Sequence, residues 1–580
     1  MPSDNADDRP VSDAAGPTIA ESSTPAGGNA AQTNLVFEGT SVCARIGESL
    51  ASALAGAGHL VMRKTARGSE RGVFCGMGVC RDCLVDIGER RNVRACMTRV
   101  EPGMAVRRAG GGSPPHEPAN ASTFRQLDTL TVDHPDVFVI GAGPAGLSAA
   151  LSARRAGARV VLADERAKPG GQYFKQSSTG SPVDRQQDEG RRLIERALDE
   201  GVEIWSDTLV WGGFEPLDFA INRAGGTMVV RPRAAVYAGG AYEKPWPVPG
   251  WVLPGVMTTG AAQTMWRSDR RLAGKRILIA GNGPLNLQLA SELLAGGAEV
   301  VAIVEAAPSP RSFLNAARMV LSAPGLVMQG LRYLANCRRA GVPLLYGSQV
   351  GAIVQTTAGL EVHVAGVNER SLAADIVCLG YGFLPSNELL RAMGARCRYD
   401  SGAGHSVVER TAECETSITG LFAIGDCTGL NGARVALAEG TLAGAAAAQR
   451  AGFGSPARET LRNASASLRR HRRFQKALWS VYQPLMNSAP AADDTIVCRC
   501  EEVSRGDILS ALEEGYHTAA SIKQRTRLGM GHCQGRYCGT ILSALLEQNG
   551  HEVDDHSGFA PRFPVKPVPI GSLALDPAEL

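Results

Sequence analysis

The chain has 580 residues, which at about 100–200 residues per domain predicts several domains. Apolar residues make up 44% and charged residues 20%, as in ordinary globular proteins, and the net charge is only +3. This balance gives no support to nucleic-acid binding or to a role at a membrane surface. No apolar run reaches the ~18–20 residues that span a bilayer, and residues 1–33 lack the basic start and apolar core of a secretory signal. We therefore expect a cytoplasmic protein with a disordered N-terminal tail.

The first predicted domain covers residues 34–108 and includes a helix over Ser49–Ala55. Four of its cysteines have the spacing C-x4-C-x2-C with a more distant fourth Cys, which is typical of plant-type [2Fe–2S] ligation. Thiolates neutralise the iron charge, and Gly76 and Gly78 allow a tight loop that aims backbone N–H groups at the sulfurs. Zinc also takes four thiolates, but structural zinc sites usually pair two C-x2-C units, and this group has one. The candidate ligands are Cys75, Cys80, Cys83 and Cys96.

A Gly/Pro/Ser-rich linker over residues 109–134 precedes a nucleotide-binding pattern. The strand Val137–Ile140, a glycine-rich turn, an Ala-rich helix and the strand Val160–Ala163 form a βαβ unit. In such a turn the first glycine makes the bend, the second admits a pyrophosphate and the third allows the helix to pack closely on the strand. The helix N-terminus supplies N–H groups and positive dipole to the diphosphate. The turn residues assigned to FAD are Gly141, Gly143, Ala145 and Gly146.

Two further segments complete the predicted FAD site. About twenty residues after the turn, Glu165 or Asp164 should accept hydrogen bonds from the adenosine ribose, and we prefer Glu165. Gly171 and Gln172 continue the flavoprotein pattern. Near the other end of the domain, the segment TSITGLFAIGD resembles the second flavin motif of flavoproteins with two dinucleotide-binding domains. By that resemblance its last two residues bind FAD, with the carboxylate on the ribityl chain: Gly425 and Asp426.

The βαβ pattern returns between these two motifs, with strands at Arg276–Ala280 and Val300–Val304. Gly281 and Gly283 open the turn, and Glu305 ends the second strand, which suits the ribose 2′-hydroxyl of NAD. We therefore expect an inserted NAD(P)-type domain.

Asn286 replaces the third glycine of this second turn. The change should hold the helix away from the strand or require compensation, so the domain binds NAD(H), another nucleotide, or none. No C-x2-C pair lies in the central region, which argues against a redox disulfide there. We also find no His/Asp or Ser/His arrangement suited to hydrolysis, and the catalytic residues stay unassigned.

The C-terminal part begins with a predicted linker helix over residues 456–490. A Cys-rich domain over residues 491–553 follows, and then a Pro-rich tail over residues 554–580. The cysteine spacing and its glycine-rich approach resemble the bacterioferritin-associated-ferredoxin (BFD) type of [2Fe–2S] domain, with zinc as the alternative metal. The implied ligands are Cys498, Cys500, Cys533 and Cys538.

The predicted fold is therefore multidomain α/β. Its Rossmann-like core combines an FAD-binding domain over residues 135–255 and 370–455 with the inserted nucleotide domain over residues 256–369. A ferredoxin-like α+β domain precedes this core, and a small helical BFD-like domain follows it.

From residue 34 onward the chain resembles a fusion of the small and middle subunits of the bacterial hydrogen cyanide synthase, opine oxidase and hydroxyproline dehydrogenase group. Its centre is similar to the alpha subunit of sarcosine oxidase. The resemblance implies an electron-transfer subunit, with FAD and two [2Fe–2S] clusters, of a heteromeric amine, amino-acid or opine dehydrogenase or oxidase. It also allows an FMN at a subunit interface and peripheral membrane association through a partner.

The resemblance further implies a partner subunit similar to D-amino-acid oxidase, because a third Rossmann start for such a module is missing from this sequence. The substrate, the final electron acceptor and the oligomeric state stay open. One alternative is a self-contained NAD(P)H:acceptor oxidoreductase. The other is a non-catalytic, zinc-stabilised nucleotide-binding scaffold.

Overall fold

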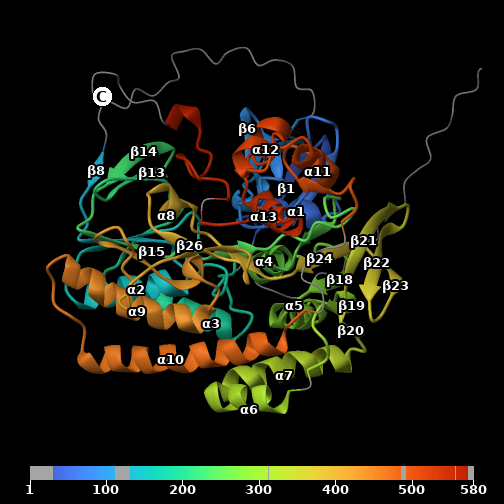
Figure 1. Ribbon diagram of the computed structural model, residues 1–580. Helices are drawn as coiled ribbons and strands as arrows, with labels where there is room; N and C mark the ends of the chain where they lie inside the picture. Colours follow the sequence, from blue (N-terminus) through green and yellow to red (C-terminus); the bar gives the residue numbers. More distant parts are fainter. Residues whose placement is uncertain are drawn as a thin grey trace, which may run out of the picture.

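The computed structural model describes residues 31–110, 131–178, 180–310, 312–484, 491–555 and 557–572. In Figure 1, a two-part α/β core carries two small domains, one from each end of the chain, on the same side. Most of the predicted tail 1–33 and linker 109–134, and part of the tail 554–580, lie outside the described residues.

The N-terminal domain is built on a five-stranded sheet of order β2-β1-β7-β5-β6. Leu35 and Phe37 alternate with exposed residues along β1 and are buried against Leu50 of helix α1. Ser49 caps α1, so the helix predicted over Ser49–Ala55 is present one residue later. The elements are β1 (Gln32–Phe37), β2 (Thr40–Arg45), α1 (Leu50–Gly56), β3 (Arg63–Lys64), β4 (Glu70–Arg71), β5 (Leu84–Ile87), β6 (Arg90–Arg94) and β7 (Ala105–Arg108).

The first part of the core is a three-layer domain around a parallel sheet of order β11-β10-β9-β15-β28. Strands β9 and β10 have the predicted bounds and are buried throughout, as expected for central parallel strands. Helices cover one face of this sheet and a second sheet, of order β12-β13-β14-β8, covers the other. The elements are β8 (Val132–Asp133), β9 (Val137–Ile140), α2 (Pro144–Arg155), β10 (Val160–Ala163), α3 (Arg185–Asp199), β11 (Glu203–Trp205), β12 (Leu209–Phe214), β13 (Asp218–Arg223), β14 (Gly226–Val230), β15 (Ala234–Tyr237), β28 (Leu421–Ala423) and α9 (Ala433–Arg450).

Helices α2 and α9 pack at backbone distance, which brings their N-termini to one end of the sheet. A Cβ added at Gly440 or Gly444 of α9 would lie 2.2 Å from a carbonyl oxygen of α2. These two glycines are one turn apart and share a face of the helix. Their lack of side chains therefore sets how closely the two helices approach.

The inserted part has its own parallel sheet, of order β17-β24-β18-β19-β20, with an antiparallel sheet of order β21-β22-β23 beside it. Because β24 pairs between β17 and β18, the inserted domain extends to Gly380, beyond the predicted end at residue 369. Its elements are β17 (Val256–Thr258), α4 (Thr259–Asp269), β18 (Arg276–Gly281), α5 (Pro284–Ala295), β19 (Glu299–Glu305), α6 (Phe313–Ser322), α7 (Pro324–Arg339), β20 (Leu344–Tyr346), β21 (Ser348–Thr356), β22 (Gly359–Gly366), β23 (Arg370–Ala374) and β24 (Ile376–Gly380).

Two short antiparallel pairs and a short helix surround the point where the chain returns from the inserted domain. Strand β16 pairs with β25, which links the two parts of the core. The elements are β16 (Ala241–Glu243), β25 (Phe383–Pro385), α8 (Glu388–Ala392), β26 (Cys397–Asp400) and β27 (His405–Val408).

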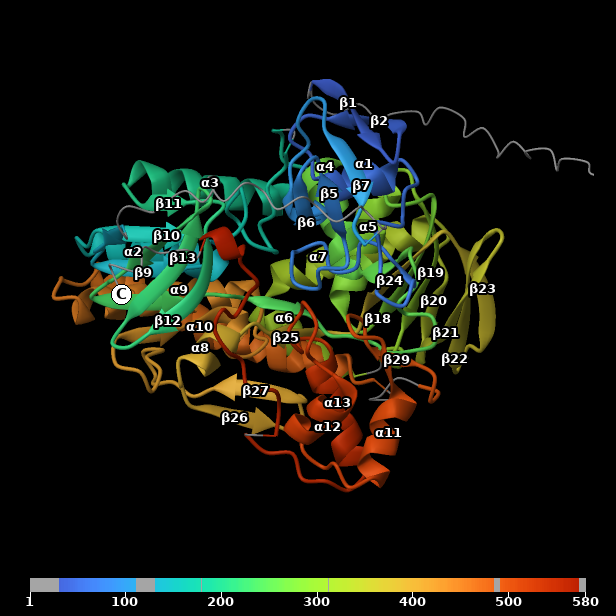
Figure 2. The ribbon, with the colours of Figure 1, turned by 90° about the horizontal axis from the view of Figure 1, so that it is seen from above.

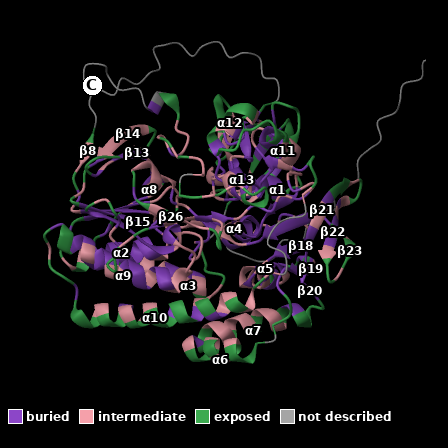
Figure 3. Ribbon diagram, in the orientation of Figure 1, coloured by how far each residue is buried: buried purple, intermediate pink, exposed green. Residues whose placement is uncertain are grey.

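The long helix α10 (Arg458–Val481) crosses beneath both parts of the core in Figure 1, and Figure 3 shows it mostly exposed or half-buried. The predicted linker helix is therefore present, while residues 485–490 lie outside the described part of the chain. The C-terminal domain then packs three helices on a short strand pair, and Figure 2 shows it next to the inserted domain. Its elements are β29 (Ile496–Cys498), β30 (Val503–Ser504), α11 (Arg505–Glu513), α12 (Ala519–Thr526) and α13 (Cys538–Gln548).

Candidate functional site

The first cysteine group lies in the loop between β4 and β5 and in a short 3-10 helix after β6. Cys75, Cys80 and Cys83 are buried and Cys96 is half-buried. The thiols lie in two hydrogen-bonded pairs, Cys75 with Cys80 and Cys83 with Cys96. A two-iron cluster needs two thiolates on each iron, and this arrangement provides them.

Backbone N–H groups point at these sulfurs, as we predicted from the two glycines of the loop. Gly76 and Gly78 both have positive φ, and the Cys80 N–H donates to Cys75 Sγ at 3.3 Å. Burial raises the pKa of the Cys75 thiol, but hydrogen bonds from Cys80 and from loop amides outweigh burial and lower that pKa to about 6. The loop therefore favours a thiolate at Cys75.

The second group joins the end of β29 to the start of α13. Its thiols also form two pairs, Cys498 with Cys538 and Cys500 with Cys533. The Cys538 thiol and loop amides lower the pKa of Cys498 to about 6 against the effect of burial. Among the described residues, no three His, Cys, Asp or Glu side chains converge on one point as ligands of a single ion. The sulfurs are grouped by twos in both domains.

The glycine-rich turn after β9 has the geometry that a dinucleotide requires. A Cβ at Gly146 would lie 1.8 Å from the carbonyl oxygen of Gly141, and Gly141 itself has a φ of +102°. A Cβ at Gly143 would meet only the Cα of Gly171, at 3.9 Å. The first and third glycines are thus required by packing, whereas the second faces open space where a pyrophosphate fits.

The two acidic residues after β10 have different surroundings. Asp164 accepts hydrogen bonds from the backbone N–H groups of Ala142 at 2.6 Å and of Arg166 at 2.8 Å. Glu165 instead accepts from Arg94 Nη1 at 2.6 Å and forms an ion pair with Lys566. Burial raises the pKa of Glu165, but these two cations outweigh burial and hold it well below its usual range. The carboxylate of Asp164 is therefore occupied by backbone N–H groups of its own loop, which favours Glu165 as the ribose ligand.

A single cavity of about 710 Å³ collects the predicted FAD residues. Asp426 lies on its wall, where one carboxylate oxygen accepts from the N–H of Gly432 at 2.8 Å, next to the start of α9. The N-termini of α2 and α9 both face this cavity and offer their positive ends to it. Of the ten residues predicted for FAD, Gly146 is absent from the wall, and the nine that line it are Gly141, Gly143, Ala145, Asp164, Glu165, Gly171, Gln172, Gly425 and Asp426.

Both cysteine loops contribute to the wall of the same cavity. Met77 and Val79 come from the stretch between Cys75 and Cys80, and Arg536 comes from the stretch between Cys533 and Cys538. The predicted FAD residues and both cysteine loops therefore line one cavity.

The inserted domain has the nucleotide-binding fold, but its three predicted nucleotide ligands do not line this cavity. Gly281 and Gly283 retain positive φ, and Glu305 accepts from the N–H groups of Gly283 at 3.1 Å and Ala307 at 3.0 Å. Burial raises the pKa of Glu305 to about 7. Its carboxylate thus bonds its own loop, as Asp164 does in the first part. The position that corresponds to Glu165 is Ala306, which has no polar side chain for a ribose.

The substituted third glycine is compensated by hydrogen bonding. Asn286 is buried, accepts from the Thr259 hydroxyl at 3.0 Å and donates to the Gly380 carbonyl at 3.3 Å. The ring of Trp479, from α10, lies 3.5 Å from where a Cβ of Gly283 would be. The NAD assignment stays a prediction, and this geometry does not favour it.

Several residues of the site have no motif around them in the sequence. Arg94 comes two residues before Cys96, and Lys566 belongs to the segment that the sequence predicted as a tail. Lys175 and Glu243 are buried on the cavity wall. Burial lowers the pKa of Lys175 to about 7 and raises that of Glu243 to about 7. No local sequence pattern predicts Arg94, Lys566, Lys175 or Glu243 as site residues, because distant segments of the chain bring each of them to the site.

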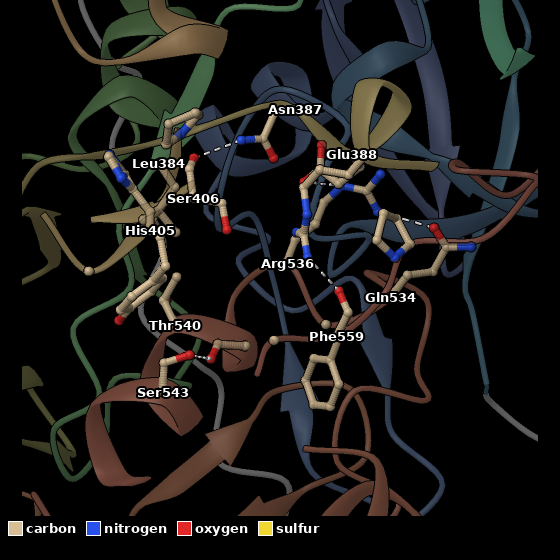
Figure 4. A pocket seen from close by; sticks show the side chains of 18 of the residues that line it. Leu384, Asn387, Glu388, His405, Ser406, Gln534, Arg536, Thr540, Ser543 and Phe559 are labelled. Atoms are coloured by element: carbon tan, nitrogen blue, oxygen red, sulfur yellow. Dashed lines mark hydrogen bonds and ion pairs between the residues drawn. The ribbon is translucent and has the colours of Figure 1, made fainter. Parts of the chain in front are cut away.

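A second, smaller cavity of about 100 Å³ lies where the C-terminal domain meets the core. Figure 4 shows side chains from both sides of this junction, with Glu388 and His405 from the core and Arg536 from the cysteine loop. Arg536 Nε lies 3.3 Å from Glu388 Oε1. This contact ties the second cysteine loop to the wall of the larger cavity.

Comparison with known proteins agrees with this arrangement. Residues 135–452 match the family model described as pyridine nucleotide-disulphide oxidoreductase. Residues 30–111 match a 2Fe-2S iron-sulfur cluster binding domain, and residues 496–548 match a BFD-like [2Fe-2S] binding domain. The predicted fold class is confirmed, and the chain is an FAD-dependent iron–sulfur oxidoreductase with FAD and two [2Fe–2S] clusters as cofactors. Which residues bind these cofactors stays a prediction.

Two curated relatives are similar over most of their own length. The A subunit of opine oxidase from Agrobacterium tumefaciens (strain Ach5) is 33% identical over 476 residues, covering 78% of this chain and 94% of the relative. The HcnB subunit of hydrogen cyanide synthase from Pseudomonas aeruginosa is 30% identical over 455 residues, covering 75% and 97%. The crystal structure of L-proline dehydrogenase from P. horikoshii has a TM-score of 0.69 at 19% identity, covering 94% of this chain and 98% of that one, which shows a shared fold.

The predicted resemblance is therefore confirmed. Among the described residues, no helix is both long and apolar enough to cross a bilayer. One family model spans more than half of the chain, and relatives at 30% identity or more are covered over nearly their whole length. The chain belongs to the pyridine nucleotide-disulphide oxidoreductase family and, within it, to the group that contains the opine oxidase A subunits.

Proposed function

We propose that this chain is the electron-transfer subunit of a heteromeric enzyme that oxidises the C–N bond of an amine, an amino acid or an opine. The relatives are named as subunits of opine oxidase and hydrogen cyanide synthase, which supports both the substrate class and the need for a partner. The partner would be a flavoprotein similar to D-amino-acid oxidase that removes the hydride.

In this proposal Gly143 and the start of α2 hold the pyrophosphate of FAD, Glu165 holds the ribose, and Asp426 holds the ribityl chain. The two cysteine groups each hold one [2Fe–2S] cluster through four thiolates. FAD accepts electrons in pairs and releases them singly, which suits it to feed carriers that take one electron each.

The observation that carries the proposal is the shared cavity wall. Met77 and Val79 belong to the first cysteine loop and line the cavity predicted for FAD. Arg536 belongs to the second cysteine loop and lines the same cavity. Residues of both cysteine loops thus line the cavity that the predicted FAD residues also line.

Purification from the native host tests this proposal. We expect an amine-oxidising flavoprotein to co-purify with the chain. Anaerobic addition of an opine or amino-acid substrate should bleach the flavin and reduce the clusters of the complex, but not those of the chain alone. NADH serves as the comparison: rapid flavin reduction by NADH in the isolated chain would instead favour a self-contained NAD(P)H:acceptor oxidoreductase.

A further inference from the structure

An ion pair joins the two cysteine loops directly. Arg499 stands between Cys498 and Cys500, and Asp82 stands between Cys80 and Cys83. Arg499 Nε donates to Asp82 Oδ2 at 2.7 Å. The two small domains lie on the same side of the core in Figure 1, and this contact brings their ligand loops together.

The pair is buried, and further contacts hold both of its members. Asp82 is 0% exposed and Arg499 is 5% exposed. The second oxygen of Asp82 accepts from Arg63 at 2.9 Å, and Arg499 Nη1 donates to the Trp251 carbonyl at 2.7 Å. The guanidinium carbon of Arg499 lies 3.8 Å from the ring centre of Phe74 and 4.8 Å from that of Trp251. The guanidinium is therefore fixed in position and orientation.

Stability alone does not explain this ion pair. Removing two charges from water costs several kcal/mol per ion, so a buried pair is often no more stabilising than apolar side chains of the same size. Phe74 and Trp251 pack on the guanidinium, and the other charged groups acting on Asp82 are Arg63 and Arg71, which are buried too. A charge retained in such a setting calls for a role that an apolar side chain cannot fill.

Aromatic rings form a second link beside the ion pair. Phe74 precedes Cys75, Tyr537 precedes Cys538, and their ring centres are 5.5 Å apart. Cys75, Cys80 and Cys533 belong to the same buried cluster as these rings. The Tyr537 side chain is buried, and its hydroxyl has no hydrogen-bond partner among the described residues.

Each cluster gains one negative charge when it takes up one electron, and no bond or proton need change. A fixed cation nearby stabilises the reduced form and raises the potential, and a fixed anion does the opposite. The guanidinium of Arg499 is built into one ligand loop and is held against the other.

We propose that Arg499 is a positioning residue that couples the two clusters into one electron-transfer unit, by holding their ligand loops together and raising both reduction potentials. Phe74 and Tyr537 then provide the direct route for an electron from one cluster to the other. This inference rests on the proposed function, because it takes the eight cysteines as cluster ligands.

Charge-changing variants of opposite sign separate this role from simple packing. Arg499→Met removes the cation, and at a fixed potential it should lower the reduced-to-oxidised ratio of both clusters about tenfold, which is about 59 mV for a one-electron couple. Asp82→Asn removes the anion and should shift both potentials upward. Arg499→Lys keeps the charge and should restore the potentials.

The measurement is a potentiometric titration of the anaerobically purified enzyme, followed by electron paramagnetic resonance. Arg527→Met is the matched control, because Arg527 pairs with Glu501 beside Cys500 but is 67% exposed, so its potentials should match the wild type. In the fully reduced wild type, the two cluster signals should show magnetic interaction with each other. If Arg499→Met loses its iron, Asp82→Asn and Arg499→Lys are judged by the same criteria.

Unchanged potentials in both charge variants, or shifts of the same sign, would overturn the role of Arg499. Two independent signals in the reduced wild type would overturn the coupling. A wild type with no iron–sulfur signal at all would contradict the proposed function itself, so the two failures are distinguishable.

Discussion

Glu165 Oε1 accepts a hydrogen bond from Arg94 Nη1 at 2.6 Å, and this contact joins the flavin domain to the residue two positions before Cys96. Arg94 also donates to the Gly78 carbonyl at 3.1 Å, within the first cysteine loop. One guanidinium thus holds the predicted ribose ligand and the cysteine loop together. The N-terminal domain is therefore part of the wall of the flavin site, in addition to its own cluster site.

Replacing Glu165 by Gln should weaken FAD binding. Hydrogen bonds to a charged group contribute about 1.5–3 kcal/mol each, so losing the carboxylate should raise the Kd for FAD roughly 10- to 100-fold. Titration of the deflavinated protein with FAD, followed by flavin fluorescence, measures this. Glu203→Gln, an exposed change on β11, is the control. An unchanged Kd for Glu165→Gln would assign the ribose contact elsewhere.

Two glycine variants of the same turn should fail in different ways. Gly143→Ala adds a methyl group to open space at an ordinary φ of −77°, so the fold should survive while FAD content falls. Gly146→Ala adds a methyl group that would lie 1.8 Å from the Gly141 carbonyl oxygen, so the stability of the fold should fall. Thermal unfolding and flavin content of both variants test the contrast. Full flavin content in Gly143→Ala would mean that no pyrophosphate lies at this glycine.

Single cysteine variants should each remove one cluster. Cys80→Ala and Cys533→Ala should each lose about two of about four irons, because alanine leaves one iron of a [2Fe–2S] cluster without a side-chain ligand. FAD should remain in both, since neither side chain lines the cavity. Cys43→Ala, at an exposed cysteine, is the control and should keep all its iron. Iron and sulfide analysis decides, and full iron in either test variant would show that its cysteine is not a ligand.

The junction at His405 should make stability depend on pH. Burial lowers the pKa of His405 to about 4, the Asp400 carboxylate opposing and the Lys244 ammonium adding to this shift, and neither ring nitrogen has a partner among the described residues. The folded-state pKa is therefore depressed, so this stability is present above the unfolded pKa of about 6.5 and is lost as pH falls from there toward 4.

His405→Gln removes this titration. The difference in free energy of unfolding between wild type and His405→Gln should shift against the wild type by roughly 1 kcal/mol as pH falls from 7.5 to 5.5, and the gap between their thermal unfolding midpoints should change in the same direction. Scans of both proteins at several pH values measure it. A gap that stays constant across this range would mean that His405 is protonated as readily in the folded chain as in the unfolded one.

Local patterns predicted much of this molecule. The runs at Val137–Ile140 and Val160–Ala163 are continuous apolar segments, and they are the two central parallel strands. Spacing, and for the second group a resemblance, singled out eight cysteines as ligands, and the fold brings their thiols together in pairs within each small domain. Each of these features depends on residues that are close together in the sequence, and sequence patterns are most informative over such short distances.

What escaped prediction depends on contacts between distant segments. Lys566 reaches Glu165 across 401 residues, and Arg499 reaches Asp82 across 417. Trp479 covers the turn at Gly283 from a helix that the sequence presents only as a linker. Side-chain packing between domains decides these contacts, and no periodicity or turn chemistry records it.

The presence of one flavin and two iron–sulfur clusters in one chain is tested most directly by flavin, iron and sulfide analysis combined with electron paramagnetic resonance on the anaerobically purified, reduced enzyme. We predict one FAD, about four irons and about four sulfides per chain, with two cluster signals that interact magnetically. Zinc in place of iron, or an iron content that accounts for a single cluster, would contradict this prediction.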